Sequence, residues 1–214
     1  MKSYENHLLT RGIQQFTIDG AIDRSTWDQQ KVKILFYLKE NYGYQDGGVM
    51  QIADYASGWL ADKNTTYAKI TALAEILHQA IEKGQPLNKE EINEVLQTVD
   101  FQTTLRKIAV VNIKKHSGES KSNAPQIREE SYANTSLLRQ QIKELSPTII
   151  IAGGTVCWHS LVYDLDLSKE SHDNPKGTST RVNGTVLCHS NHPSAWTQGG
   201  FDIYELHKSI FSTI

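Results

Sequence analysis

The sequence lacks most features of secreted, membrane-spanning or cluster-binding proteins. It has two cysteines in 214 residues, Cys157 and Cys188, which is too few for a disulfide framework or a cysteine-held iron–sulfur cluster. No run of about eighteen apolar residues is present, and the first residues lack the apolar core of a secretory signal. We therefore expect a soluble, cytoplasmic protein with reduced thiols and no membrane association.

A large charge of either sign is also absent, because the formal net charge is -2. A chain of this charge has no general electrostatic attraction to nucleic acid. The distribution is uneven, since residues 106–144 sum to +4 and the remainder to -6. This basic stretch permits one face to meet phosphates, although a solvated helix surface explains such a run equally well.

Several catalytic signatures are missing as well. The chain has neither a Walker phosphate loop nor a Gly-x-Ser-x-Gly nucleophile elbow, which disfavours a nucleoside triphosphatase and a serine hydrolase. A cysteine nucleophile is disfavoured because Cys157 has no evident histidine partner. His189 and His192 stand near Cys188, but Pro193 follows and no second compact ligand pair exists. We therefore expect neither a metal site nor a cofactor.

Short apolar runs alternate with helical stretches, which predicts an α/β domain. Four runs have the length of strands: residues 32–38, 107–111, 148–152 and 185–188. Helices are expected over residues 52–60, 65–81, 89–99, 137–145 and 203–211, and a long polar loop over residues 163–183. We predict a single domain over residues 1–214, with residues 1–30 as an N-terminal extension. Its fold would be a three-layer α/β/α sandwich with a central, mainly parallel four-stranded sheet.

Polar or reactive side chains follow each predicted strand. The first strand is followed by Lys39, Glu40, Asn41 and Tyr42; the second by Asn112 and a loop with Lys114, Ser117 and Ser122; the third by Gly153; the fourth by His192, Pro193, Ser194 and an exposed Trp196. Each alone has an ordinary explanation as a turn, a helix start or a solvated charge. Because ligands of parallel sheets bind outside the carboxyl ends of the strands, their occurrence at all four ends favours a shared site.

In this order the four stretches resemble the motifs of the uracil-DNA glycosylase superfamily. Residues 32–43 are similar to its strand followed by Gly-Gln-Asp-Pro-Tyr-His, and residues 110–122 to its strand ending in a base-reading Asn with a Gly-x-x-x-Ser loop. Residues 149–155 resemble its third strand with a Gly-Ser or Gly-Thr helix start, and residues 192–197 its His-Pro-Ser-Pro-Leu-Ser signature. The resemblance covers residues 31–211 and implies the same fold.

The chain departs from the family's pattern in its first motif. Glu40 stands where the best-known branch has a water-directing Asp, while Asn41 and Gly43 replace the Pro and His of that motif. Leu38 stands where the family prefers Gly. These departures leave open a catalytically silent protein of the same fold that binds a nucleobase or nucleic acid.

The resemblance implies hydrolysis of the N-glycosidic bond of uracil or a related damaged base in DNA, by a monomer without a cofactor. Glu40 would position or activate water, with Asn41 as a substitute if the register slips by one residue. A neutral His192 would donate a hydrogen bond to a base oxygen. A carboxylate near the sugar and a donor near the base suit the charges that develop as this bond breaks.

The resemblance also implies binding roles for single-stranded DNA or a duplex with a flipped base. Base contacts would come from Lys39, Tyr42 and Asn112, and Tyr55 or Trp59 would stack on the flipped base. The DNA backbone would be held by Lys114, Ser117, Ser122, Gly153, Pro193 and Ser194. Trp196 would act as the wedge that enters the base stack.

Overall fold

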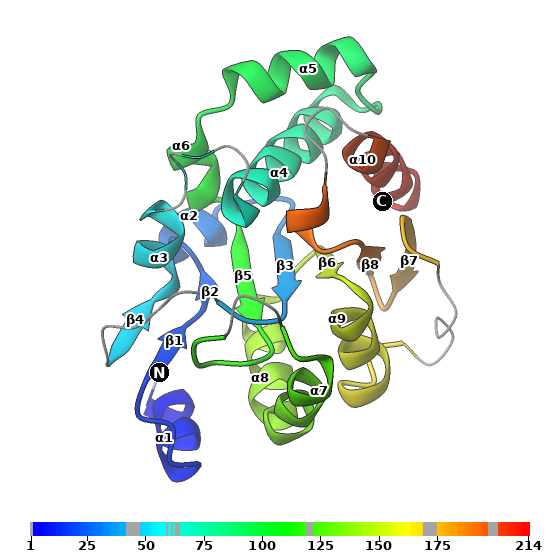
Figure 1. Ribbon diagram of the computed structural model, residues 1–214. Coiled ribbons are helices and arrows are strands. Elements are labelled where there is room, and N and C mark those ends of the chain that lie inside the picture. The colour runs from blue at the N-terminus through cyan, green and yellow to red at the C-terminus, as the bar shows by residue number, and fades with distance from the viewer. Residues whose placement is uncertain are drawn as a thin grey trace.

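The four apolar runs of the sequence form the adjacent central strands of one sheet in the computed structural model (Figure 1). In sheet order they are β5 (Ala109–Asn112), β3 (Ile34–Leu38), β6 (Ile149–Gly153) and β8 (Thr185–Ser190), and each is parallel to its neighbours. All of β3, β5 and β6 is buried. Burial on both faces explains why these strands appear in the sequence as continuous apolar runs. The structure describes residues 2–41, 48–58, 60, 62, 65–118, 122–168, 175–196 and 201–214.

The described sheet has six strands and not the predicted four. Two antiparallel strands complete its edges, β2 (Gly20–Ala21) beside β5 and β7 (Thr178–Val182) beside β8. Strand β7 falls in the stretch that the sequence predicted to be a loop. A separate parallel pair joins β1 (Phe16–Ile18) to β4 (Val49–Gln51). The edge strands are short or polar, so they give no apolar run, and the protein is an α/β protein with a mainly parallel six-stranded mixed sheet.

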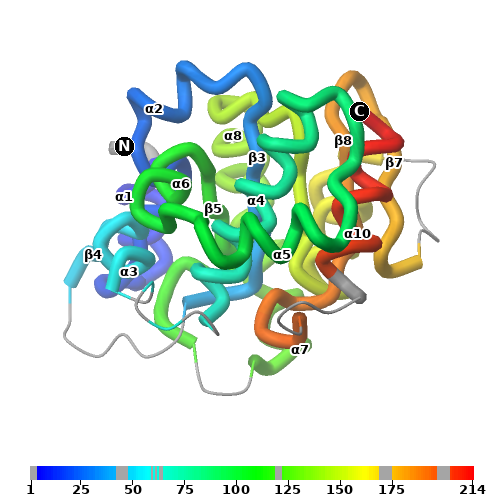
Figure 2. The backbone as a smooth tube through the Cα atoms, turned by 90° about the horizontal axis from the view of Figure 1, so that it is seen from above, coloured from blue at the N-terminus to red at the C-terminus, as the bar shows by residue number. Residues whose placement is uncertain are grey.

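Helices cover both faces of this sheet. One face carries α4 (Thr66–Lys83), α5 (Lys89–Thr98), α6 (Phe101–Arg106) and α10 (Phe201–Thr213), and the other carries α7 (Ala124–Ala133), α8 (Thr135–Leu145) and α9 (Thr155–His159), which continues as the π-helix η1 (Ser160–Asp164). Figure 2 shows α4 and α5 across the middle of the sheet, with α1 and α10 toward opposite ends. Alternate residues of each central strand enter the two hydrophobic cores, as the pleat of a strand requires.

The predicted helices are present with nearly the expected bounds, because their ends carry clear signals. Thr65 caps the start of α4 by accepting a hydrogen bond from the backbone N–H of Ala68, and Gly84 ends the helix with a φ of 74°. A capping box between Asn88 and Glu91 opens α5. Among the described residues, no helix is long and apolar enough to cross a membrane.

The first thirty residues, expected to be an extension, contribute to the sheet. They form α1 (Lys2–Thr10), β1, β2 and α2 (Arg24–Asp28). Tyr4, Leu8 and Phe16 pack with Leu137 of α8 in a third small core. The remaining described elements are α3 (Ile52–Gly58) and the 3-10 turn η2 (Pro193–Ala195).

Candidate functional site

The carboxyl ends of the four central strands lie level with one another. Leu38 pairs with Asn112 across β3 and β5, and Gly153 pairs with Ser190 across β6 and β8. A Cβ atom on Gly153 would lie 2.6 Å from Leu38 Cδ2 and 3.2 Å from Pro193 Cδ. The missing side chain at this position therefore lets the ends of β3 and β6 and the turn after β8 approach one another closely.

Glu40 follows β3 and is buried against Lys114, which follows β5. Lys114 Nζ lies 3.0 Å from Glu40 Oε2, and each side chain is 4% exposed. Neither carboxylate oxygen of Glu40 accepts a well-directed hydrogen bond from any described residue. A Cβ atom on residue 118 would overlap the Glu40 carboxyl group, so glycine at this position lets the carboxyl group lie where it does. Glu40 thus has one cationic neighbour and unused hydrogen-bonding capacity.

Two asparagines and a tyrosine meet beside this pair. Asn41 Oδ1 accepts hydrogen bonds from Tyr67 Oη at 2.7 Å and from Asn112 Nδ2 at 3.3 Å. Asn112 is 1% exposed, and its Oδ1 has no hydrogen-bond partner among the described residues. An unpaired buried acceptor is costly, so this oxygen is a candidate for pairing with a ligand N–H group.

Tyr67 of α4 was missed by the sequence analysis, since one tyrosine on an amphipathic helix gives no functional signal. Burial raises its pKa, so the hydroxyl stays protonated and donates to Asn41. The ring of Tyr55, predicted to stack on a base, lies edge-on to the Tyr67 ring with centroids 5.6 Å apart. Tyr42 and Trp59, the other predicted aromatic contacts, lie outside the described residues.

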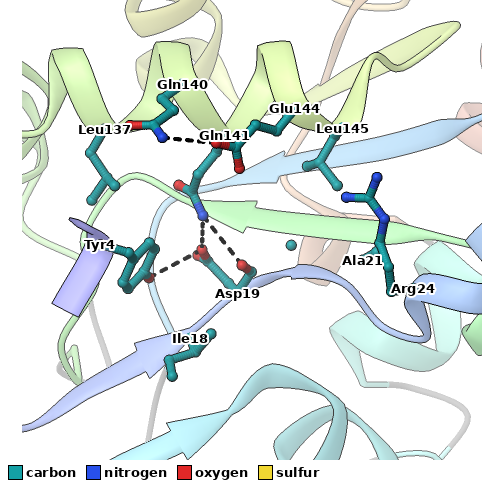
Figure 3. Close-up of a pocket in the computed structure, with 11 residues that line it drawn as sticks. Tyr4, Ile18, Asp19, Ala21, Arg24, Leu137, Gln140, Gln141, Glu144 and Leu145 are labelled. Carbon is teal, nitrogen blue, oxygen red and sulfur yellow. Dashed lines mark hydrogen bonds between the residues drawn. The ribbon is translucent and has the colours of Figure 1, made fainter. Parts of the chain in front are cut away.

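Asp19, also missed, holds the opposite side of Asn112. Its Oδ2 accepts the backbone N–H of Asn112 at 2.6 Å, and its two oxygens lie 2.9 and 3.0 Å from Lys115 Nζ. Gln141 Nε2 donates to Oδ1 at 2.8 Å, and Tyr4 Oη lies 3.3 Å from the same atom. Figure 3 shows Tyr4 and Gln141 directed toward Asp19. All three residues line a cavity of about 240 Å³. Asp19 is separated from Asn112 by 93 positions, so no local motif could have indicated it.

His192 begins the turn after β8 and presents a neutral ring. Its Nδ1 accepts the backbone N–H of Ser194 at 3.2 Å, which places the ring proton on Nε2. Burial lowers the pKa of His192 to about 4; the positive charges of Lys39 and Lys69 lower it as well, and Glu40 opposes them. The ring is therefore neutral near pH 7, with Nε2 as the donor.

Trp196 is buried, so the expectation of an exposed aromatic was wrong. Its side chain is 1% exposed and belongs to the core under α4 and α10. The indole Nε1–H donates to the backbone oxygen of Asn191 at 2.9 Å, which closes the turn on itself. In this conformation the ring is not available as a wedge.

The residues expected to contact the DNA backbone differ in exposure. Ser194 is exposed and Ser117 and Ser122 are half-buried, whereas Pro193 and Gly153 are buried at the rim. Lys114, expected on the surface, lies in the interior because it pairs with Glu40 and lies 3.3 Å from Gln126 Oε1. Lys115 is buried with Asp19. The basic stretch therefore offers fewer cations to a phosphate than its composition suggested.

The described residues contain no group of three or more His, Cys, Asp or Glu side chains placed to hold a metal ion. Neither a protein-family model nor a curated protein sequence matches this chain. The interpretation of the site therefore depends on its own geometry.

Proposed function

We propose that this protein is a DNA glycosylase of the uracil-DNA glycosylase fold, which hydrolyses the N-glycosidic bond of uracil or a related damaged base. The observation that carries the proposal is the unpaired, buried Oδ1 of Asn112 at the end of β5. It lies on the same rim as the Nε2–H of His192 and the carboxylate of Glu40. The level, parallel order of the four central strands supports the same assignment.

Each of these groups has a use in base excision. Asn112 Oδ1 accepts the N–H of a pyrimidine edge, and a base without that donor leaves the buried oxygen unpaired. As the bond between C1′ and the base nitrogen breaks, its electron pair moves into the base and His192 donates to a base oxygen. Water then adds its oxygen to C1′, and its proton passes through Glu40 to the departing base. The negative charge of Glu40 also offsets positive charge on the sugar.

The pairing of Glu40 with Lys114 favours a second candidate, a catalytically silent protein of this fold that binds a nucleobase or nucleic acid. Lys114 Nζ is 3.0 Å from the carboxylate and nearly as buried. The lysine offsets the charge that would stabilise the sugar, and Gly118 packs directly over the carboxyl group. The base-reading groups Asn112 and His192 are retained in this candidate.

Base excision from single-stranded oligonucleotides tests the two candidates. The parent protein is incubated with strands that carry uracil, hypoxanthine, xanthine or an alkylated base, and abasic sites are cleaved with alkali. Glu40→Gln is expected to slow excision by about 100-fold or more, the usual effect of removing a group that acts on water. Glu82→Gln, an exposed position on α4, serves as the matched control and should excise like the parent.

The outcomes separate the candidates. Excision that is unaffected by Glu40→Gln would remove the carboxylate from the mechanism. A parent that excises no base but binds the modified oligonucleotides more tightly than unmodified ones would replace the enzyme by the silent binding protein. If the parent neither excises a base nor binds the modified oligonucleotides more tightly than unmodified ones, both candidates are refuted.

A further inference from the structure

Lys69 of α4 reaches the turn that carries His192. Its Nζ donates to the backbone oxygen of Trp196 at 2.5 Å and lies 3.3 Å from that of Ser194. These carbonyl groups stand at the end of η2, where the last carbonyl oxygens of a helical turn have no partner within the turn. A lysine in this position satisfies them and opposes their partial negative charge.

The same turn determines what the ring of His192 can do. The Ser194 N–H binds Nδ1 at 3.2 Å, and Ser194 Oγ lies 2.7 Å from the same atom. Ala195 N–H donates to the His192 oxygen at 2.8 Å and completes the turn. Ser194 thus contacts His192 through its backbone nitrogen and Lys69 through its backbone oxygen. Displacement of the Ser194 carbonyl would also displace the N–H that selects the ring tautomer.

Charged groups face His192 from two elements. Lys39 and Glu40 approach from the segment after β3, and Lys69 approaches from α4. The two lysines disfavour the imidazolium form and Glu40 favours it. Lys69 differs from Lys39 because it also bonds to the backbone of the turn.

We propose that Lys69 is a positioning residue for His192: by binding the Ser194 and Trp196 carbonyls it fixes the turn and holds the Ser194 N–H on Nδ1, which leaves Nε2–H as the donor. We call the hydrogen bonds from Lys69 to these two carbonyls the clamp. The use of the Nε2–H donor in base excision rests on the proposed function, whereas the clamp can be measured without any activity. Lys69 acts through the turn and does not contact the base.

Histidine ring NMR tests the clamp directly. The chain has eight histidines, and the His192→Asn spectrum identifies the His192 signal. In the parent, His192 should titrate near the pKa of about 4. Lys69→Met keeps the apolar stem and removes the charge, so the pKa of His192 should rise. It should stay below the ordinary value, because burial, the largest cause of the shift, remains.

Two further variants define the cause. Lys83→Met removes a lysine from the last turn of α4, where the amine pairs with Glu91, and should leave the His192 titration unchanged. Lys69→Arg retains a cation and several donors, so it should restore most of the parent's behaviour. Amide hydrogen exchange at pH 7 gives a second readout, in which Lys69→Met should speed exchange at Ala195 and Trp196 at least several-fold.

An unchanged His192 titration together with unchanged amide exchange in Lys69→Met would overturn the clamp. If both change while the parent excises no base, the clamp holds and the proposed function fails. If the parent is active, Lys69→Met should lower kcat, and equal activity in the presence of a shifted titration would show that the clamp does not serve catalysis.

Discussion

Two consecutive lysines that follow β5 each pair with a buried carboxylate, Lys114 with Glu40 and Lys115 with Asp19. The two carboxylates differ in how much of their hydrogen-bonding capacity the protein fills. Both lysines follow the end of β5, where the chain bends. The distances are nearly equal, at 3.0 and 2.9 Å. The difference lies in what else surrounds each carboxylate.

Asp19 has its hydrogen-bonding capacity filled by the protein. Its two oxygens are approached by Lys115, Gln141, Tyr4 and the Asn112 N–H, and neither side chain of the ion pair is exposed. Figure 3 shows Tyr4 and Gln141 beside Asp19. A buried ion pair offsets its desolvation only when such additional bonds are present. This cluster is therefore structural, and it fixes the backbone of Asn112.

Glu40 has the ion pair without the accompanying hydrogen bonds. Both of its oxygens are buried and lack a hydrogen-bond partner among the described residues. Buried polar groups of folded proteins are nearly always bonded, and exceptions concentrate at functional positions. The comparison indicates that Asp19 serves stability, and that Glu40 has bonding capacity left for water or a ligand.

The largest expected effect is the loss of stability in Asp19→Asn. The substitution leaves Lys115 buried and charged, and it directs an NH2 group toward donors that previously met an oxygen. Breaking a fully buried pair in this way costs about 3 to 5 kcal/mol. Urea unfolding followed by circular dichroism measures the change in the free energy of unfolding.

The exposed ion pair between Arg24 and Asp28 provides the control. Asp28→Asn also removes the carboxylate charge of an aspartate that is paired with a cation. This pair lies at the surface, where ion pairs contribute little to stability. A loss in Asp19→Asn no larger than that in Asp28→Asn would refute the structural role of Asp19.

A smaller loss is expected when the Glu40 pair is broken. Glu40→Gln keeps the shape of the side chain, and Lys114 retains its contact with Gln126, so we expect about 1 to 3 kcal/mol. Lys114→Met leaves a buried carboxylate without its cation and should cost at least as much. The double variant, with both Glu40→Gln and Lys114→Met, should lose less stability than the sum of the two single losses, because both charges are then absent. Additive losses in the double variant would show that the two groups are not coupled.

The contrast between the two pairs also shows what the sequence could predict. The four central strands were identified correctly because burial on both faces produces continuous apolar runs such as residues 148–152. The positions of Glu40, Asn112 and His192 at one rim followed from parallel strand direction. The edge strand β2 has two residues and leaves no pattern to detect.

The burial of Lys114 and Lys115 could not be predicted, because a lysine after a strand is exposed in most proteins. Their placement depends on Asp19 and Glu40, which are distant in sequence and become neighbours only after the sheet forms. The burial of Trp196 depends likewise on its packing in the core under α4. Such contacts are tertiary, and no local periodicity encodes them.

The smallest expected effect distinguishes the two carboxylates through His192. The folded-state pKa of His192 is about 4, below the ordinary value of 6.5. Between about pH 6.5 and pH 4, His192 is protonated in the unfolded chain but not in the folded protein. The contribution of the neutral His192 to stability is therefore complete above about pH 6.5 and is lost as the pH falls toward 4. Glu40 favours the imidazolium form, whereas Asp19 is not among the groups that shift His192. Glu40→Gln should lower the His192 pKa further by a fraction of a unit and extend the pH range over which stability is lost. Asp19→Asn should leave the His192 pKa unchanged. NMR titration of the His192 ring in both variants measures the two pKa values. Equal shifts would contradict the conclusion that Glu40 belongs to the site of His192 and that Asp19 does not.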